Sequence, residues 1–506
     1  MNPDWQNLTD PFFHWAAQRP DAVALRQGPE TLSYRELAVL VGKAAVHLDG
    51  IGIRQGDCVA INLTNSIDHL ILTLGLLRLG ATTMEIPYNV QRPPHAGLLA
   101  QFAVRTVFIE PMGAPVEGAA AIKVDANWRG LIGRAQGDRR SGDDGGGIFT
   151  VSLSSGTTGQ PTGALVSHRE YFQRINTGMA MYADTDVFSS ERPPNLLLVG
   201  GIAFSFYFWH MAIQLCIGGS ITILPDFLHT VDLVKAIGAW DDAVCDVTSP
   251  MCRVLLSCAP QEGLLYPRLR ALLAGGGFVY PQEKLAMLAR VTPNFYEIYG
   301  VAGFGPVATL SPAELHDHAD SVGRPPPVIE VQVVDDDGRP LPTGRAGRLR
   351  LRYRPIEGER IAVGADPAGA EGWRDGWYYP GDSAHLDAAG YIHIRGRPVE
   401  IIERNGVEFY AADIEAVIAQ HPSVSEVAVV GVPRPLPGDE IVALVVPRGP
   451  SQHEALAQHC KNRLPAERWP DRVFYTGALP KTASGKLDRT EVKAMVMAEI
   501  ARRAGQ

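Results

Sequence analysis

A run of ten small and polar residues, directly after a short apolar stretch, constrains the fold of this chain more than any other segment. The run reads Ser154, Ser155, Gly156, Thr157, Thr158, Gly159, Gln160, Pro161, Thr162 and Gly163. Its glycines permit a tight backbone path, and its N–H groups and hydroxyls can face phosphate oxygens. We therefore predict that residues 154–159 bind phosphate after the strand-like residues 148–151. A surface turn is the alternative, whereas a P-loop is excluded because the pattern Gly-x4-Gly-Lys-Ser/Thr is absent.

The length and charge of the chain favour a multidomain enzyme that acts on a small molecule. At 506 residues, the chain exceeds what one hydrophobic core usually organises. Hydrophobic residues make up 46% of it and charged residues 20%, as in an ordinary globular protein. The modest net charge of -9 and the lack of a basic run argue against nucleic acid as a partner.

The cysteines and the apolar segments favour a cytoplasmic protein without a membrane span. The six cysteines show no C-x-x-C spacing, so we expect mostly buried thiols in a reducing compartment rather than a zinc site. No secretory leader is visible at the N-terminus. Residues 196–224 are long and almost free of charge, which makes them the alternative candidate for a span. Paired glycines divide them, however, into a strand, a short helix and a second strand of a layered core.

The order of the expected elements predicts an α/β fold with a second, smaller α+β unit. Two helices and a strand between them are expected at residues 34–48, 68–79 and 58–62. This alternation is typical of α/β layers. From Val328 onward, short strands separated by turns predict a β-rich subdomain, and after Arg397 strands and helices form a compact pattern of their own. We therefore expect a large layered N-terminal domain, residues 1–396, and a small C-terminal domain, residues 397–506.

The ten-residue run resembles the phosphate-binding signature of the adenylate-forming (ANL) superfamily, which includes acyl-CoA synthetases, luciferases and the adenylation domains of peptide synthetases. Its members often read S-G-T-T-G-x-P-K-G, and this chain has Thr162 in place of that lysine. The lost cation weakens the attraction to phosphate, although the backbone cradle remains. The resemblance implies an acyl-CoA synthetase-like fold with a mobile C-terminal domain. It also implies a free-standing, AMP-forming acid ligase that uses ATP and Mg²⁺.

Two further motifs resemble the part of the family's site that holds the ribose of ATP. The pair Gly381-Asp382 resembles the end of T-G-D, and the resemblance implies that Asp382 accepts hydrogen bonds from two ribose hydroxyls, which suits a carboxylate. Residues 391–397 resemble G-Y-x-x-I-x-G-R, which implies that Arg397 contacts ribose or phosphate just before the hinge between the domains. Pro398 follows, so we expect rotation at this hinge to be restricted or displaced.

A fourth motif lies near the C-terminus, where residues 479–489 resemble P-x-T-x-x-G-K. The resemblance implies that Lys486 is the catalytic lysine. A mobile ammonium at the reacting carboxylate and α-phosphate neutralises the charge that builds up as pyrophosphate departs. For any single lysine, a solvated surface charge is the alternative.

The family's Y-G-x-T-E motif is matched only in part. The resemblance implies that Tyr299 packs on adenine and that Gly300 follows it at the ATP site. Ala302 and Gly303 replace the threonine and the glutamate, which in relatives contact the α-phosphate and Mg²⁺. Neither replacement can coordinate a hard cation. The metal ligands therefore stay unknown, with Glu297 as a conceivable substitute.

By the same resemblance, the acid pocket is built from four segments and is apolar and aromatic. Its expected residues are Phe204, Ser205, Gly275, Gly277, Val301, Ala302 and Gly303. Gly276, between two of them, is expected at the ATP site, where the glycine-rich strand backs the adenine. Relatives that take α-amino acids usually place an aspartate where this chain has Ser205. An α-amino acid is therefore disfavoured, and an aryl or hydrophobic carboxylic acid is favoured.

The acceptor of the activated acid stays open between CoA and a separate carrier protein, because the chain reaches Gln506 without a carrier module. Two other functions also stay open. Some relatives adenylate an unusual acid such as nitrous acid for attack by an amine. The other open function is nucleotide binding without catalysis, because Thr162, Ala302 and Gly303 all depart from the family pattern.

Overall fold

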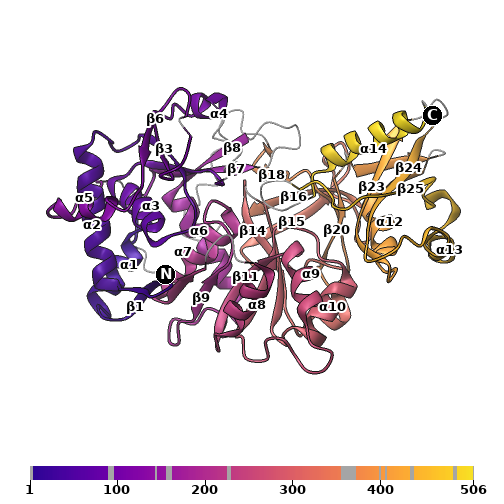
Figure 1. Ribbon diagram of the computed structural model, residues 1–506, viewed down its shortest axis with the longest axis horizontal. Helices are drawn as coiled ribbons and strands as arrows, with labels where there is room; N and C mark the ends of the chain where they lie inside the picture. Colours follow the sequence, from indigo (N-terminus) through magenta and orange to yellow (C-terminus); the bar gives the residue numbers. More distant parts are fainter. Residues whose placement is uncertain are drawn as a thin grey trace.

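The computed structural model describes most of the chain. The described residues are 4–88, 96–114, 116–142, 145–154, 162–224, 229–301, 303–354, 372–397, 400–404, 407–433, 438–481 and 487–504. Their elements form layers of sheets and helices in the N-terminal part, and the C-terminal part lies at one end of the molecule (Figure 1). This arrangement confirms the predicted α/β class with a large N-terminal and a small C-terminal domain.

The largest sheet has eight strands and is parallel except at its two edges. In spatial order the strands are β14 (Gly305–Leu310), β13 (Phe295–Val301), β12 (Ala271–Gly275), β11 (Ala243–Thr248), β9 (Asn195–Leu198), β10 (Ser220–Ile223), β1 (Val23–Gln27) and β2 (Glu30–Ser33). Every residue of β12 is buried. Such uniformly apolar strands suit a parallel sheet that is covered by helices on both faces.

A second sheet of six strands carries the two ends of the predicted phosphate loop. Its order is β6 (Ala120–Lys123), β5 (Thr106–Ile109), β3 (Cys58–Asn62), β4 (Thr82–Glu85), β7 (Ile148–Ser154) and β8 (Thr162–Ser167). β7 and β8 pair antiparallel, and Ser154 lies opposite Thr162. The predicted strand 148–151 is therefore confirmed as part of β7, and the loop leaves and re-enters the sheet at neighbouring positions.

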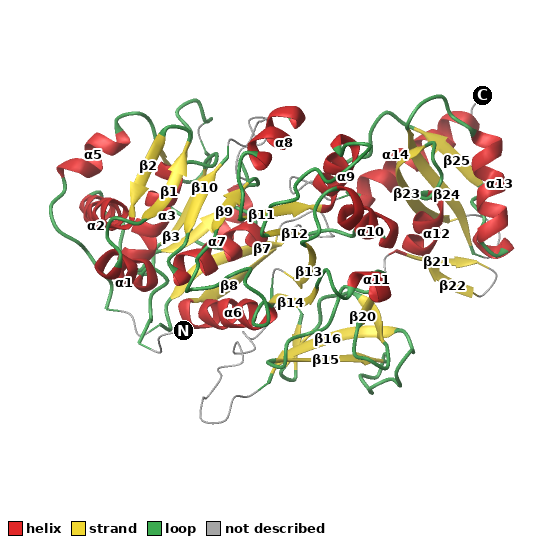
Figure 2. Ribbon diagram, turned by 90° about the horizontal axis from the view of Figure 1, so that it is seen from below, coloured by secondary structure: helices red, strands yellow, loops and turns green. Residues whose placement is uncertain are grey.

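Helices cover these two sheets (Figure 2). They are α1 (Asp10–Gln18), α2 (Tyr34–Gly50), α3 (Ile67–Leu79), α4 (Ala96–Gln101), α5 (Trp128–Arg134), α6 (His168–Met181), α7 (Ser205–Ile217), α8 (Thr230–Gly238), α9 (Ser249–Cys258), α10 (Pro281–Arg290) and α11 (Leu315–His318). α2 and α6 each begin at a serine capping box, which satisfies their first backbone N–H groups. The helices predicted at 34–48 and 68–79 are confirmed as α2 and α3.

The apolar segment 196–224 folds as predicted into β9, α7 and β10. In the described part of the chain, no helix has both the length and the apolar character needed to cross a membrane. All six cysteines are free thiols, and four of them are buried: Cys216, Cys245, Cys252 and Cys460.

The predicted β-rich subdomain is a sheet of six strands: β15 (Ile329–Val334), β16 (Gly347–Tyr353), β17 (Trp373–Arg374), β18 (Trp377–Tyr378), β19 (Ser383–Leu386) and β20 (Ile392–Gly396). Phe304 and Val307 pack into its core. Because Phe304 directly precedes β14, the β-rich sheet is attached to the edge of the eight-stranded sheet, beside the end of β13.

The C-terminal part has two small sheets and apolar clusters of its own. Its elements are β21 (Ile401–Arg404), β22 (Val407–Tyr410), α12 (Ala411–Ile418), β23 (Val424–Pro433), β24 (Asp439–Pro447), α13 (His453–Arg463), the 3-10 helix Ala466–Arg468, β25 (Arg472–Tyr475) and α14 (Arg489–Ala504). These strands and helices match the compact pattern that the sequence predicts after Arg397.

Candidate nucleotide and acid site

Asp382 lies between β18 and β19, and the fold brings it together with two other predicted ATP-site residues. The Tyr299 hydroxyl, from β13, donates a hydrogen bond of 2.5 Å to Oδ2 of Asp382. Nε of Arg397, which follows β20, donates to Oδ1 at 3.3 Å. Burial, followed by the neighbouring Asp382 charge, raises the pKa of Tyr299 well above its ordinary value. The phenol therefore stays protonated and remains a donor to the carboxylate.

The Asp382 side chain is 12% exposed, so it is oriented by its neighbours and still accessible to a ligand. A carboxylate held by a phenol and a guanidinium retains lone pairs that can accept hydrogen bonds from the two hydroxyls of a ribose. The arrangement of these three residues therefore suits the binding of the ribose of ATP.

Glycines at and beside the turn between β13 and β14 allow close packing of the chain. A Cβ atom at Gly300 would lie 3.0 Å from the carbonyl oxygen of Gly305, and one at Gly303 would meet the Tyr378 hydroxyl. Gly305 itself has a φ of +110°, which favours glycine. Tyr378 thus fills the space beside Gly303, where relatives carry a glutamate. The packing of Tyr378 beside Gly303 therefore occupies the space that an acidic side chain would need.

Glu297 is unsuited to replace the missing metal ligand. Its carboxylate forms an ion pair with Nζ of Lys284, which also donates a 2.7 Å hydrogen bond to the Ser321 carbonyl. The two side chains are only 4% and 2% exposed. Burial raises the pKa of Glu297, and the Lys284 charge opposes this effect. Within the described ranges, no three His, Cys, Asp or Glu side chains gather into a group that could hold a metal ion.

The glycine-rich end of β12 is packed against the chain's own side chains. A Cβ atom at Gly275 would lie only 2.5 Å from the nearest atom of the Phe206 ring. A Cβ atom at Gly277 would collide with Oγ of Ser249. Gly276 has a φ of +75°. The glycines therefore allow Phe206 and Ser249 to approach the strand end closely. Phe206 follows Phe204 and Ser205 at the start of α7, so this expected pocket segment does meet β12.

A second part of the expected acid pocket is a small cavity of about 40 Å³. Ser205, the first residue of α7, and Ile202, which precedes that helix, line it. Ser152 lines it from β7, two residues before the phosphate loop. Arg174 of α6 also lines this cavity, and its Nη2 donates to the Gly303 carbonyl at 3.3 Å. The sequence analysis missed Arg174. The sequence does contain one signal for it: a charged residue between Phe172 and Ile175, on the otherwise buried face of an amphipathic helix.

Several predicted site residues lie outside the described residues. They are Ser155, Gly156, Thr157, Thr158, Gly159, Ala302 and Lys486, together with the side chain of Ser154. Two residues that flank Lys486 are described. Lys481 forms an isolated β-bridge with Leu487, and its Nζ lies 3.0 Å from Oε1 of Glu426. The strand-like bridge therefore draws together the two ends of the lysine-bearing segment.

Comparison with known families agrees with this arrangement. A model of the family described as AMP-binding enzyme matches residues 12–354. The chain belongs to this family. A model of the AMP-binding enzyme C-terminal domain matches residues 413–486 in addition. The resemblance to the adenylate-forming superfamily is thus confirmed, and this AMP-binding enzyme is an AMP-forming acid ligase.

Curated relatives of this AMP-binding enzyme match it over nearly its whole length. Indoleacetate–CoA ligase of Aromatoleum aromaticum is 27% identical over 95% of this chain and 96% of its own. Fatty acid–[acyl-carrier-protein] ligase ScoC of Streptomyces coeruleorubidus is 26% identical over 99% of both chains. Among solved structures, o-succinylbenzoate CoA synthetase of Bacillus subtilis, in complex with its acyl-adenylate intermediate, has a TM-score of 0.82 at 20% identity, with 96% and 98% of the chains covered.

Proposed function

We propose that this AMP-binding enzyme uses ATP to convert a carboxylic acid into an acyl-adenylate, with release of pyrophosphate, and then transfers the acyl group to a thiol of CoA or of a separate carrier protein. The observation that carries this proposal is the meeting of Tyr299, Asp382 and Arg397 from three separated segments. Relatives named as CoA ligases and as a carrier-protein ligase support both acceptors.

In this proposal, residues 154–159 hold the phosphates, and Asp382 and Arg397 hold the ribose. Tyr299 and Gly300 lie beside the adenine, and Lys486 acts on the reacting carboxylate and α-phosphate. Attack of the carboxylate oxygen on the α-phosphorus forms the acyl-adenylate and breaks the bond to pyrophosphate. During this attack, Lys486 stabilises the negative charge of the transition state. Magnesium accompanies ATP in this family.

We further propose that residues 1–396 and residues 397–506 form two domains, which rotate against each other between the two half-reactions. Among the described residues, three side-chain hydrogen bonds cross this boundary, and one of them is the bond from Arg397 to Asp382. The Tyr410 hydroxyl donates to Ser383 Oγ at 2.5 Å, and Nη2 of Arg395 donates to Asp413 at 2.8 Å. Rotation has to exchange these contacts for others. The small number of polar contacts here favours two alternative arrangements of similar free energy.

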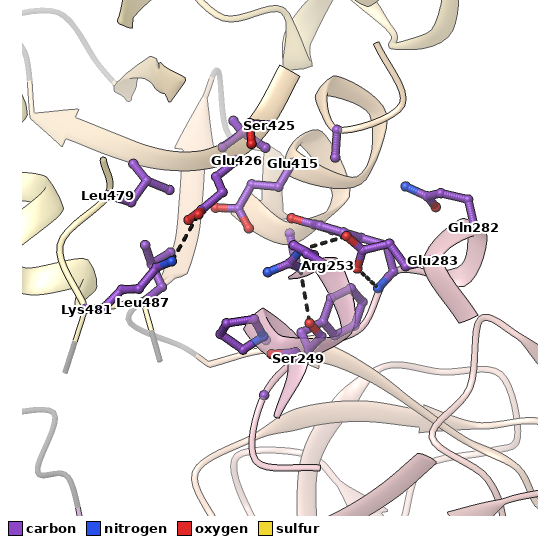
Figure 3. A pocket seen from close by; sticks show the side chains of 18 of the residues that line it. Ser249, Arg253, Gln282, Glu283, Glu415, Ser425, Glu426, Leu479, Lys481 and Leu487 are labelled. Carbon is purple, nitrogen blue, oxygen red and sulfur yellow. Dashed lines mark hydrogen bonds and ion pairs between the residues drawn. The ribbon is translucent and has the colours of Figure 1, made fainter. Parts of the chain in front are cut away.

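A cavity of about 430 Å³ lies along the same boundary and suits the approach of a thiol acceptor. Figure 3 shows Arg253 and Glu283 on one wall and Glu415, Glu426 and Lys481 on the other. The first two come from α9 and α10, and the other three from the C-terminal part. Because both parts line the cavity, rotation would open or close it.

For the acid, the aromatic residues near Gly275 and the absence of an aspartate at Ser205 favour an aryl or hydrophobic carboxylate over an α-amino acid. The altered residues at positions 162 and 303 favour the second candidate, an unusual acid such as nitrous acid followed by attack of an amine. Six free cysteines are consistent with the cytoplasm, which is the compartment we propose.

Acid-dependent exchange of pyrophosphate into ATP tests the first half-reaction. We expect exchange with at least one carboxylic acid, and a decrease of about 10²- to 10³-fold in the Lys486→Ala variant. Lys493→Ala, on the exposed side of α14, is the matched control and should exchange at the wild-type rate. Exchange with nitrite alone would establish the second candidate. Retained ATP binding without exchange for any acid would indicate a non-catalytic relative.

A further inference from the structure

We infer that Arg174 selects an acid that carries a second anionic group, remote from the carboxylate that is activated. This inference rests on the proposed function and specifies the substrate class of the same site. The preferred substrate is a dicarboxylic acid that is adenylated at one end while its other carboxylate binds Arg174.

The guanidinium of Arg174 is buried and held from several sides. The residue is 8% exposed, although it belongs to a helix with exposed positions. Its Nη2 donates to the Gly303 carbonyl, its guanidinium carbon lies 6.0 Å from the centre of the Tyr171 ring, and its backbone carbonyl accepts a 3.1 Å hydrogen bond from the Trp209 indole. A Cβ atom at Gly305 would lie 2.9 Å from its Cγ, so that glycine leaves room for the arginine stem.

The cavity beside Arg174 has the size and the donors that suit a carboxylate. A cavity of about 10–15 Å³ holds one water molecule, so this cavity of about 40 Å³ holds a group of roughly three heavy atoms. Ser152 and Ser205 line the cavity and carry hydroxyls that can donate to an anion. The rings of Phe149, Tyr171 and Phe208 form much of the remaining wall.

One acidic residue, Glu85, also lines the cavity, but its oxygens have partners within the protein. Thr73 Oγ1 donates to Oε1 at 2.8 Å, and Oε2 lies 2.9 Å from Nε2 of His69. The side chains of His69 and Thr73 are buried. Both oxygens of Glu85 therefore have partners inside the protein, and the guanidinium of Arg174 is the cationic group among the lining residues.

The low exposure makes Arg174 a strong discriminator. A guanidinium binds a carboxylate through two parallel, charge-assisted hydrogen bonds, which a neutral ester cannot reproduce. A site that is built to bind a polar group rejects an analogue without that group far more strongly than an apolar pocket rejects one extra methylene. Arg174 thus binds the far carboxylate of the acid.

The test compares dicarboxylic acids with their monomethyl esters, because each pair shares one carbon skeleton and one free carboxylate for activation. Succinate, glutarate, adipate and phthalate give a panel of aliphatic and aryl skeletons. We expect the wild-type enzyme to show a kcat/KM for pyrophosphate exchange about 10²-fold or more higher with the best diacid than with its ester. In Arg174→Gln this ratio should fall to near one, mainly because KM for the diacid rises.

Two further variants separate substrate selection from a structural role. Arg169→Gln changes an exposed arginine on the same helix and should leave the ratio unchanged. Arg174→Lys keeps the charge without the planar fork, so it should restore part of the ratio. Thermal unfolding of all three variants verifies that they are folded.

Equal or better exchange with the esters, or an unchanged ratio in a folded Arg174→Gln variant, would overturn the inference while the proposed function stands. Absence of exchange with every acid, including simple monocarboxylates, would overturn the proposed function and this inference with it. The two failures are therefore distinguishable.

Discussion

Lys284 and Arg174 are both buried cations on helices next to the nucleotide and acid site, yet their surroundings differ. Lys284 of α10 meets the carboxylate of Glu297 and the carbonyl of Ser321 in the core. Arg174 of α6 donates to the Gly303 carbonyl and borders a cavity. The lysine thus meets a carboxylate in a closed environment, whereas the arginine lines a cavity. Burial alone does not distinguish a charge that is enclosed in the core from one that lines a cavity.

The largest expected effect tests the structural half of this comparison. Lys284→Met leaves the Glu297 carboxylate buried without its cation, and we expect the free energy of unfolding to fall by about 3–5 kcal/mol. Urea denaturation followed by circular dichroism measures this change. Replacing both partners, with Lys284→Met and Glu297→Leu together, should recover most of the loss, because no uncompensated charge remains. A double variant as unstable as the single one would contradict this account of the pair.

The instability of Lys284→Met should depend on pH. Burial already raises the pKa of Glu297, and the loss of the lysine removes the effect that opposes this rise. A folded-state pKa above the unfolded value means that the folded state binds the proton more tightly, so stability falls as the pH rises through this window. We therefore expect the stability deficit to be smallest near pH 5 and to grow toward neutral pH. Denaturation curves across this range, with wild type in parallel, measure it, and a deficit independent of pH would argue against Glu297 as the cause.

A smaller effect is expected at the carboxylate that faces the nucleotide. Asp382→Asn should weaken ATP binding by about 1.5–3 kcal/mol, because hydrogen bonds to a charged acceptor are replaced by those of an amide. Titration calorimetry with ATP measures this, and the unfolding temperature should change little. Asp336→Asn, at a fully exposed side chain, is the control. A large loss of stability with unchanged ATP affinity would place Asp382 with Glu297 rather than with Arg174.

The smallest effect is expected at the surface pair near the lysine-bearing segment. The side chains of Lys481 and Glu426 are both substantially exposed. Glu426→Gln should therefore change the free energy of unfolding by less than about 1 kcal/mol. Thermal unfolding measures this at low and at high salt, and any effect should shrink at high salt. A change comparable to that of Lys284→Met would show that this pair contributes more to the stability of the C-terminal part than its exposure indicates.

Much of the fold was predictable because its signals are local. The strand 58–62 and the helices near 34 and 68 follow from hydrophobic period and from serine N-caps such as Ser33 and Ser66. The segment 196–224 could be assigned to the core because its paired glycines interrupt any long helix. β25 and β17 were not predictable in the same way, since such short strands are stabilised by their neighbours rather than by their own residues.

The site was predictable where a motif is intact and unpredictable where contacts join distant segments. Asp382 and Arg397 were identified by their resemblance to a family pattern, and their roles remain predictions. Arg174 carried no motif, and its importance depends on the distance between α6 and the turn at Gly303, which are more than a hundred residues apart in the chain. Likewise, only the position of Lys284 showed that Glu297 is engaged in the core.

The sequence by itself determined the family, the α/β architecture and the order of the nucleotide-binding segments, because short motifs and hydrophobic period are written along the chain. The tertiary structure decided which charges are enclosed in the core and which line a cavity. That distinction depends on burial and on the partners of each charged group, and both are set by residues far away in the sequence. Lys284 and Arg174 have the same charge, and the fold alone separates their roles.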